Sequence, residues 1–281
     1  MSLETTAIER LPLVRAGLNF ILPSTQKPRS FEYDPPAGMP RTTAFYEERA
    51  VAIRNMRSVA SGFSLEREGV RLVTAPSDVA DFYDESQIRN VYYPEAEKLV
   101  TELTGASRAV IFDHTIRRRI DGAADRTTGV PRQPVPRVHV DYTVKSGPQR
   151  VRDLLADEAD ELLRRRFSVI NVWRPIRGPL QDSPLAVSDA SSVQFDDLVP
   201  VDLVYQDRIG EIYMVKFNPS QRWFYAPRMS SDEVLAFKCY DSAEDGRARF
   251  APHAAFEDPT APLDAWPRES IELRVLAFHG A

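Results

Sequence analysis

Histidine is rare in this chain, with four among 281 residues, and one of the four stands beside an acidic residue in a strand-like segment. In PRVHVDYT, residues 136–143, His139 and Asp141 are two positions apart. Residues two apart on a β-strand point to the same face, so the imidazole and the carboxylate would lie side by side. Two neighbouring ligands of one metal ion have this arrangement. The alternative is a hydrogen bond between the two side chains at a strand end.

A third ligand from a distant strand would complete the facial triad of two histidines and one carboxylate that binds non-haem Fe(II) and leaves positions open for substrate and oxygen. His253, in RFAPHAAF, is the first choice, because it lies between the turn-like EDGR and a proline-bearing loop. His114 ends the run AVIF, and His279 lies so near the C-terminus that fraying would make it a poor ligand. The alternative for His253 is a histidine with a single hydrogen bond.

The segment PRESIELR, residues 267–274, alternates polar and apolar side chains. One face carries Arg268, Ser270, Glu272 and Arg274, and the other carries Ile271 and Leu273, followed by Val275. A strand with one wet face and one dry face is the simple interpretation. The alternative is that Arg268 and Ser270 bind a carboxylate, such as the distal carboxylate of 2-oxoglutarate, through the guanidinium and the hydroxyl.

Composition indicates a folded protein and disfavours some partners. Hydrophobic residues make up 43% of the chain and charged residues 27%, which is typical of soluble domains. The net charge of −5 argues against a general nucleic-acid binder, and no apolar run is long enough for a membrane span or a signal peptide. The single cysteine, Cys239, agrees with a reducing compartment and is expected to be buried. We therefore expect a cytoplasmic protein with a small-molecule substrate and no nucleic-acid or membrane partner; a homodimer is compatible with the sequence.

The pattern of apolar residues predicts a mainly β fold with flanking helices. Residues 1–75 have no clear period and are interpreted as an extended N-terminal covering segment. One helix is predicted from Pro94 to Gly105, and another, with capping-box spacing between Ser146 and Gln149, through Leu162. The strand-like runs are AVIF, VHVDYT, FSVINVW, VPVDLVY, EIYMVKF, RWFYAP, VLAFKCY and SIELRVLAF. About eight strands is the number in a jelly roll.

Motifs for nucleotide chemistry are absent from the sequence. There are no alternating βα units, and neither GxGxxG nor GxxxxGK[ST] occurs. Dinucleotide, nucleotide and S-adenosylmethionine chemistry are therefore disfavoured.

From about Val110 to Phe278, the chain resembles the hydroxylase/desaturase family that includes AsaB-type fungal enzymes, CmcJ-like cephamycin proteins and gibberellin A4 desaturase-like proteins. The matching segments are VHVDYT, INVWRPIRGPLQDSPLAVSD, RWFYAPRM, VLAFKCYDS, GRARFAPHAAFEDP and PRESIELRVLAF. They recur in order over most of the C-terminal two thirds, which makes the resemblance more specific than any single motif. The first hundred residues match more loosely.

The resemblance implies an Fe(II)/2-oxoglutarate-dependent dioxygenase built on a double-stranded β-helix, a cupin-like jelly roll. It implies one dioxygenase domain over residues 1–281, with its β-helix core at about 108–281. The implied site residues are the metal ligands and catalytic residues His139, Asp141 and His253; the cofactor-binding residues Arg268, Ser270, Asn171 and, in reserve, Arg274; and the substrate contacts Trp173, Arg174 and Tyr205.

The implied reaction uses Fe(II), 2-oxoglutarate and O2 to hydroxylate or desaturate a natural product or modified amino acid, with release of succinate and CO2. One alternative is a non-haem iron oxidase that works without 2-oxoglutarate. Others are a CmcJ-like methyltransferase or accessory protein, and a β-sandwich binding module without enzymatic activity.

Overall fold

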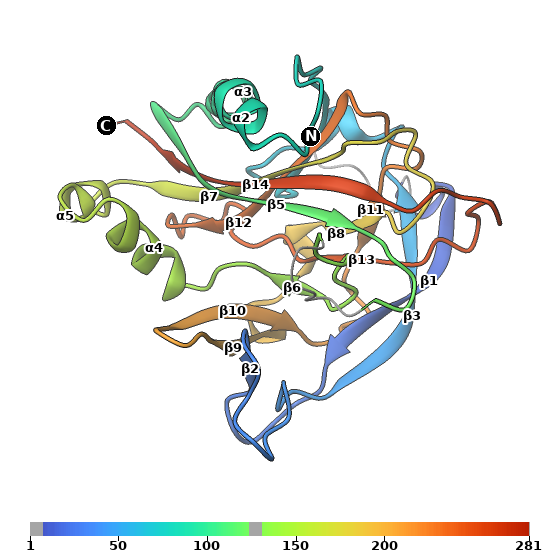
Figure 1. The fold of residues 1–281 in the computed structure, drawn as a ribbon, viewed down its shortest axis with the longest axis horizontal. Coiled ribbons are helices and arrows are strands. Elements are labelled where there is room, and N and C mark those ends of the chain that lie inside the picture. Colours follow the sequence, from blue (N-terminus) through green and yellow to red (C-terminus); the bar gives the residue numbers. More distant parts are fainter. Residues whose placement is uncertain (1–7, 124–130, 281) are drawn as a thin grey trace.

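The computed structural model describes residues 8–123 and 131–280, and in them two curved sheets pack face to face (Figure 1). The smaller sheet has the order β4 (Val70–Thr74), β12 (Glu233–Asp241), β7 (Phe167–Pro175), β14 (Glu269–Phe278) and β5 (Arg108–Arg118). The larger sheet has the order β1 (Leu13–Ile21), β3 (Tyr46–Asn55), β11 (Trp223–Tyr225), β8 (Leu185–Ser188), β13 (His253–Ala255), β6 (His139–Val140), β10 (Ile209–Val215), β9 (Leu198–Val204) and β2 (Arg29–Phe31).

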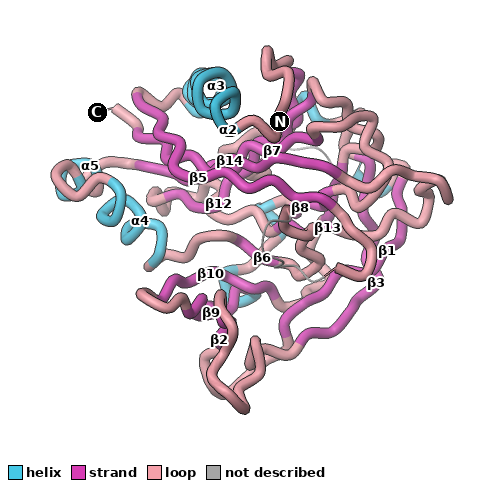
Figure 2. The backbone as a smooth tube through the Cα atoms, in the orientation of Figure 1, coloured by secondary structure: helices cyan, strands magenta, loops and turns pink. Residues whose placement is uncertain are grey.

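Helices occupy the edges and one outer face of these sheets, as Figure 2 shows in cyan. They are α2 (Glu85–Gln87), a π-helical turn (Ile88–Tyr92), α3 (Tyr93–Thr104), α4 (Ser146–Leu154) and α5 (Ala159–Leu162), with 3₁₀ turns at Ala60–Gly62, Ala190–Ser192 and Phe195–Asp197. None of the helices in the described ranges has the length and apolarity needed to cross a bilayer.

The predicted jelly-roll class is confirmed by the strand order and by the structural match given below. All eight predicted runs form strands, and strands far apart in sequence become neighbours, such as β13 between β8 and β6. The short strands β8 and β13 were not predicted, because three or four residues carry too little periodicity.

Four more strands come from the N-terminal 75 residues, where no period was found. β1 and β3 pair along their whole length, from Leu13 opposite Arg54 to Ile21 opposite Tyr46, and β3 joins the larger sheet through a parallel pairing with β11. β4 pairs with β12 at the edge of the smaller sheet. This part of the chain therefore extends both sheets at their edges.

Two separate apolar cores bury the two faces of the smaller sheet. The larger core lies between the sheets. The other lies on the outer face, where Ile271, Leu273 and Val275 of β14 join the same cluster as Ala96 and Val100 of α3. The outward side chains of β14 are therefore covered by a helix, and its inward side chains face the other sheet.

The predicted helix at residues 94–105 is confirmed. Pro94 lies in the first turn of α3, where its missing N–H costs no hydrogen bond. Gly105 ends the helix with φ = 67°, a left-handed conformation that glycine adopts without strain, and its N–H donates to the Thr101 carbonyl.

The second predicted helix is shorter than expected and is capped differently. α4 ends at Leu154, and Leu162 belongs to the separate helix α5. The expected capping box is wrong, because Ser146 lies inside the helix and Thr143 acts instead: its Oγ1 accepts from the Ser146 N–H at 3.0 Å. The Ser146 hydroxyl in turn accepts from the Thr143 N–H at 2.9 Å.

Two side chains of β12 are buried for different reasons. Cys239 is buried, as predicted for a lone cysteine, and burial, together with the nearby Asp141 and Glu272 carboxylates, raises the pKa of its thiol. Lys238 is buried with its ammonium 2.8 Å from Asp241 and 3.3 Å from Glu66. These carboxylates compensate the charge that burial would otherwise make costly.

Replacement of Leu273 by alanine should destabilise the protein, because the side chain is fully buried in the core under α3. We expect a loss of about 2–5 kcal/mol in the free energy of unfolding, the usual cost of removing a core leucine. Chemical denaturation measures this loss. The matched surface control is Lys98→Ala on α3, which should change stability by less than about 0.5 kcal/mol, and equal effects of the two changes would contradict the proposed packing.

Candidate metal centre

Adjacent strands of the larger sheet bring three possible metal ligands together. His139 on β6 and His253 on β13 are directly opposite in the antiparallel register, and Asp141 directly follows β6. One ligand atom from each of the three residues lies within 4.8 Å of the others. His139 and His253 are 114 positions apart in sequence, and a single strand pairing brings them together.

Hydrogen bonds orient both imidazole rings. His139 Nδ1 lies 2.8 Å from the Arg137 carbonyl oxygen, and His253 Nδ1 lies 3.2 Å from the Ala251 carbonyl oxygen. A carbonyl only accepts, so each Nδ1 carries the proton and each Nε2 keeps its lone pair for a metal. Burial, together with His139, lowers the pKa of His253 to about 3, which keeps this ring neutral.

Two donors bind the same oxygen of Asp141. Asn171 Nδ2 and Arg274 Nε each donate to Asp141 Oδ2 at 2.8 Å. The other oxygen, Oδ1, lies 3.4 Å from His139 Nε2. Asn171 and Arg274 are paired across β7 and β14, which explains why both reach this carboxylate. The arrangement leaves Oδ1 free to bind a metal on the side of the histidines.

Arg274 is surrounded by carboxylates. Besides Asp141, its guanidinium binds Asp113 at 2.8 Å and Glu272 at 2.9 Å. Burial would raise the pKa of Asp141, but Arg274 and His139 outweigh it and hold that pKa well below its usual value. Asp141 is therefore a carboxylate with one oxygen already oriented, as an anionic metal ligand requires.

The polar face of β14 points into the protein and is largely buried. Arg268 and Ser270 are almost fully buried, and Arg268 Nε donates to Ser270 Oγ at 3.0 Å while Nη1 donates to the Ser183 carbonyl at 2.9 Å. The guanidinium lies 5.0 Å from the centre of the Trp173 ring.

Two donors in this region have no acceptor. The Trp173 indole N–H is buried without a partner, and Arg268 Nη2 has no hydrogen bond within residues 8–123 and 131–280. No carboxylate in those ranges forms an ion pair with Arg268, and burial lowers the pKa of its guanidinium to about 9. A buried cation and a free N–H at one place fit a carboxylate ligand.

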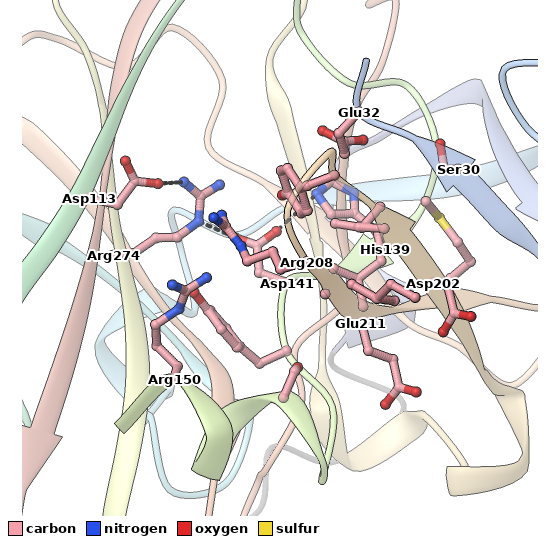
Figure 3. Close-up of a pocket in the computed structure, with 18 of the residues that line it drawn as sticks. Ser30, Glu32, Asp113, His139, Asp141, Arg150, Asp202, Arg208, Glu211 and Arg274 are labelled. Carbon is pink, nitrogen blue, oxygen red and sulfur yellow. Dashed lines mark hydrogen bonds and ion pairs between the residues drawn. The ribbon is translucent and has the colours of Figure 1, made fainter. Parts of the chain in front are cut away.

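A cavity of about 940 Å³ opens beside His139 and Asp141. Figure 3 shows side chains that enter it from different elements: Asp113 and Arg274 from the smaller sheet, Arg150 from α4, and Asp202, Arg208 and Glu211 from the β9–β10 hairpin. The hairpin forms the wall opposite the smaller sheet. The volume is sufficient for a small organic substrate.

Of the remaining predicted contacts, Trp173 and Tyr205 lie on the side of the site and Arg174 does not. Trp173 lies on the inward face of β7 with Asn171, as their spacing predicted, and Tyr205 lines the cavity. Arg174 points to the outer face instead, where its guanidinium lies 4.8 Å from the Tyr92 ring centre and donates to the Ala75 carbonyl at 2.6 Å.

Neither of the other histidines belongs to the cluster. His114 is hydrogen-bonded to the Tyr93 hydroxyl at 2.8 Å and lies 3.1 Å from a Glu85 carboxylate oxygen, beside α2 and α3. His279 follows β14, and its backbone N–H donates to the Arg166 carbonyl.

Three residues of the site were missed as contributors. Glu272 was assigned only to a polar strand face, although it is buried and binds Arg274. Asp113 also binds Arg274, and Arg150 enters the cavity from α4. The alternation of β14 could have identified Glu272. No sequence signal places α4 at the cavity.

Comparison with known proteins gives one family. The family model described as an oxidoreductase/YMDC permease-like domain matches residues 18–278. Hydroxylase/desaturase efuI of Hormonema carpetanum is 35% identical over 257 residues, which cover 83% of this chain and 84% of that protein. The Fe(II)/2-oxoglutarate-dependent dioxygenase nvfI of Aspergillus novofumigatus is 37% identical over 199 residues, 70% of this chain and 69% of that protein.

A solved structure extends the similarity to the whole fold. The iron and alpha-ketoglutarate-dependent endoperoxidase NvfI superposes with a TM-score of 0.85 and 29% sequence identity, over 96% of this chain and 99% of that one. The relatives named hydroxylase/desaturase agree with the resemblance found in the sequence. Together with the family match over residues 18–278, the similarity shows that the chain belongs to the oxidoreductase/YMDC permease-like family.

Proposed function

We propose that this protein is a non-haem Fe(II)/2-oxoglutarate-dependent oxygenase that hydroxylates or desaturates a small molecule of natural-product metabolism. The cluster of His139, Asp141 and His253 beside an open cavity is the observation that carries this proposal. The names of similar proteins support it, since they include hydroxylase/desaturases and dioxygenases that depend on Fe(II) or 2-oxoglutarate.

When bound, Fe(II), 2-oxoglutarate and O2 supply an oxidation that yields succinate and CO2 and removes hydrogen from a substrate carbon. The chain would hold the metal through Nε2 of His139, Oδ1 of Asp141 and Nε2 of His253. Three ligands on one face leave room for cosubstrate and oxygen on the other.

Asn171 and Arg274 hold the Asp141 carboxylate in place. Because both donate to Oδ2, they restrict rotation of the carboxylate and favour binding through Oδ1 alone. Asn171 is thus a positioning residue for a metal ligand, a more specific role than the cofactor contact expected from sequence. Phe237 covers His253, with ring centres 4.5 Å apart, and keeps water from that side of the site.

Arg268 and Ser270 are proposed to bind the distal carboxylate of 2-oxoglutarate, assisted by the indole N–H of Trp173. The uncompensated charge of Arg268 and the free indole donor support this role. Arg274 is the less suitable anchor, because three carboxylates already occupy its guanidinium. A buried arginine without a carboxylate partner also favours a 2-oxoglutarate-dependent enzyme over an oxidase that works without 2-oxoglutarate, because the cosubstrate would supply that partner.

Several expectations stay predictions from sequence. They are a single catalytic domain over residues 1–281, with an N-terminal covering segment at 1–75 and a core at about 108–281, and a location in the cytoplasm without nucleic-acid or membrane partners. A homodimer is also compatible with the sequence.

Alanine at any one of the three proposed metal ligands should strongly weaken metal binding. We expect His139→Ala, Asp141→Ala and His253→Ala each to lose most bound Fe(II) in anaerobic titrations, because a three-ligand site has no spare protein ligand. His279→Ala is the matched control and should bind iron normally. Full iron occupancy in His253→Ala would remove that residue from the site.

Arg268→Gln should weaken 2-oxoglutarate binding at least tenfold and leave Fe(II) binding unchanged, because the proposed ion pair with the carboxylate is buried. The visible charge-transfer band of the anaerobic Fe(II)·2-oxoglutarate complex, titrated with 2-oxoglutarate, measures this affinity. Arg177→Gln serves as the control, since that guanidinium is half exposed on the surface. An unchanged affinity in Arg268→Gln would assign the anchor to Arg274.

Asn171→Ala should reduce metal affinity by roughly 10–100-fold, the usual effect of removing a hydrogen bond to a metal ligand. One of the two donors to Asp141 Oδ2 is then lost, and the carboxylate gains freedom to rotate. Competition with a chelator of known affinity measures the change. Asn90→Ala, at a surface helical position, should have no effect, and an equal affinity in both variants would argue against the positioning role.

A further inference from the structure

The cations that line the cavity differ in how their charges are compensated. Lys27 forms ion pairs with Asp202 and Glu211 on the β9–β10 hairpin. Arg274 is bound by three carboxylates, as described above. These two cations therefore have little capacity left to bind an anionic ligand.

Arg150 has no such compensation. Its side chain extends from α4 into the cavity on the side of Arg274 and Asp141 (Figure 3). Within the described ranges no carboxylate forms an ion pair with it; its guanidinium interacts with the Tyr142 hydroxyl, and its buried Nε has no hydrogen-bond partner. Its guanidinium carbon lies 5.7 Å from the centre of the Phe112 ring, which supports it from the smaller sheet.

The position of Arg150 is fixed by the packing of its helix. Thr143 caps the N-terminus of α4, and Val151 is fully buried in the main core. Gly147 allows close contact, because a Cβ at this position would lie 2.9 Å from the Tyr240 ring. The helix therefore holds the guanidinium at the cavity wall before any ligand arrives, which lowers the entropy cost of binding.

An unpaired buried donor on a cation is energetically unfavourable, because desolvation is not repaid by a hydrogen bond. An anionic group in the cavity would supply the missing acceptor. A planar carboxylate is the best match, since a guanidinium pairs with both of its oxygens.

The opposite wall fits the rest of such a ligand. Leu203, Ile212 and Met214 of the β9–β10 hairpin line the cavity together with Phe112. These side chains offer apolar contacts within a lining that also carries Asp202, Arg208 and Glu211 of the hairpin. The apolar part of the lining suits the body of a ligand whose acidic group lies at Arg150.

We propose that the substrate is an apolar carboxylic acid whose carboxylate pairs with Arg150. This inference rests on the proposed function, since it assigns the substrate class of the same site. The distal carboxylate of 2-oxoglutarate could satisfy the same chemistry, but Arg268, its proposed anchor, is not part of the cavity lining. Arg150 therefore provides a second anion-binding position, distinct from that of the cosubstrate.

The test compares an acid with its uncharged amide. 3-Phenylpropionate and 3-phenylpropionamide are titrated calorimetrically into anaerobic protein loaded with Fe(II) and saturated with 2-oxoglutarate, so that the probe cannot occupy the cosubstrate position. We expect native protein to prefer the acid at least tenfold. The preference should disappear in Arg150→Gln, persist in part in Arg150→Lys, and stay unchanged in Arg152→Gln, an exposed arginine on the same helix.

Different failures have different meanings. Equal binding of acid and amide to native protein, or a preference that survives in Arg150→Gln, would overturn the inference. So would a tenfold loss of 2-oxoglutarate affinity in Arg150→Gln with the preference kept, since Arg150 would then serve the cosubstrate. If native protein binds neither Fe(II) nor 2-oxoglutarate, the proposed function itself fails, whereas normal binding of both without acid preference rejects only the substrate class.

Discussion

The site depends on one carboxylate oxygen, Oδ2 of Asp141, which accepts hydrogen bonds from Asn171 and Arg274. A buried carboxylate is costly unless it is paired, and a buried arginine is costly for the same reason. Here each compensates the other, and Asp113 and Glu272 complete the compensation of Arg274. The pairing has a chemical consequence as well, because it occupies one oxygen and leaves the other facing two histidines.

This network explains why β14 must be buried on both faces. Its inward side chains form the charged network and the proposed carboxylate anchor, while its outward side chains pack under α3. Without the helix, the apolar row of β14 would face solvent. The central position of β14 between β7 and β5 is equally necessary, because Arg274 is opposite Asn171 on one neighbour and Asp113 on the other. Helix α3, which lies at the outside of the molecule in Figure 1, thus supports the metal site by covering the outer face of β14.

Sequence predicted the parts of the site that depend on local spacing. The proximity of His139 and Asp141 follows from alternation on a strand, and His253 was chosen from only three candidates. Long strands of the C-terminal part were found by their period, but the long strands β1 and β3 were missed, and β8 and β13 are too short to show a period. Arg174 illustrates the opposite difficulty: matching segments indicated a substrate contact, while its place in the alternation, one residue from Trp173, puts it on the outer face. Which partner Asn171 would bind could not be predicted, because it depends on the packing of two sheets.

Charge compensation, more than charge itself, distinguishes the arginines around the cavity. A count of basic residues in the lining would suggest a general anion-binding surface, yet Lys27 and Arg274 already form ion pairs with carboxylates of the protein. Arg274 serves the metal ligand, Arg268 is buried beyond the lining beside Trp173, and Arg150 alone of these three enters the cavity without an acidic partner. Arg268 lies directly before β14 and Arg274 within it, whereas Arg150 reaches the cavity from α4, so the proposed contacts to the metal ligand, the cosubstrate carboxylate and the substrate carboxylate are made by three different guanidiniums.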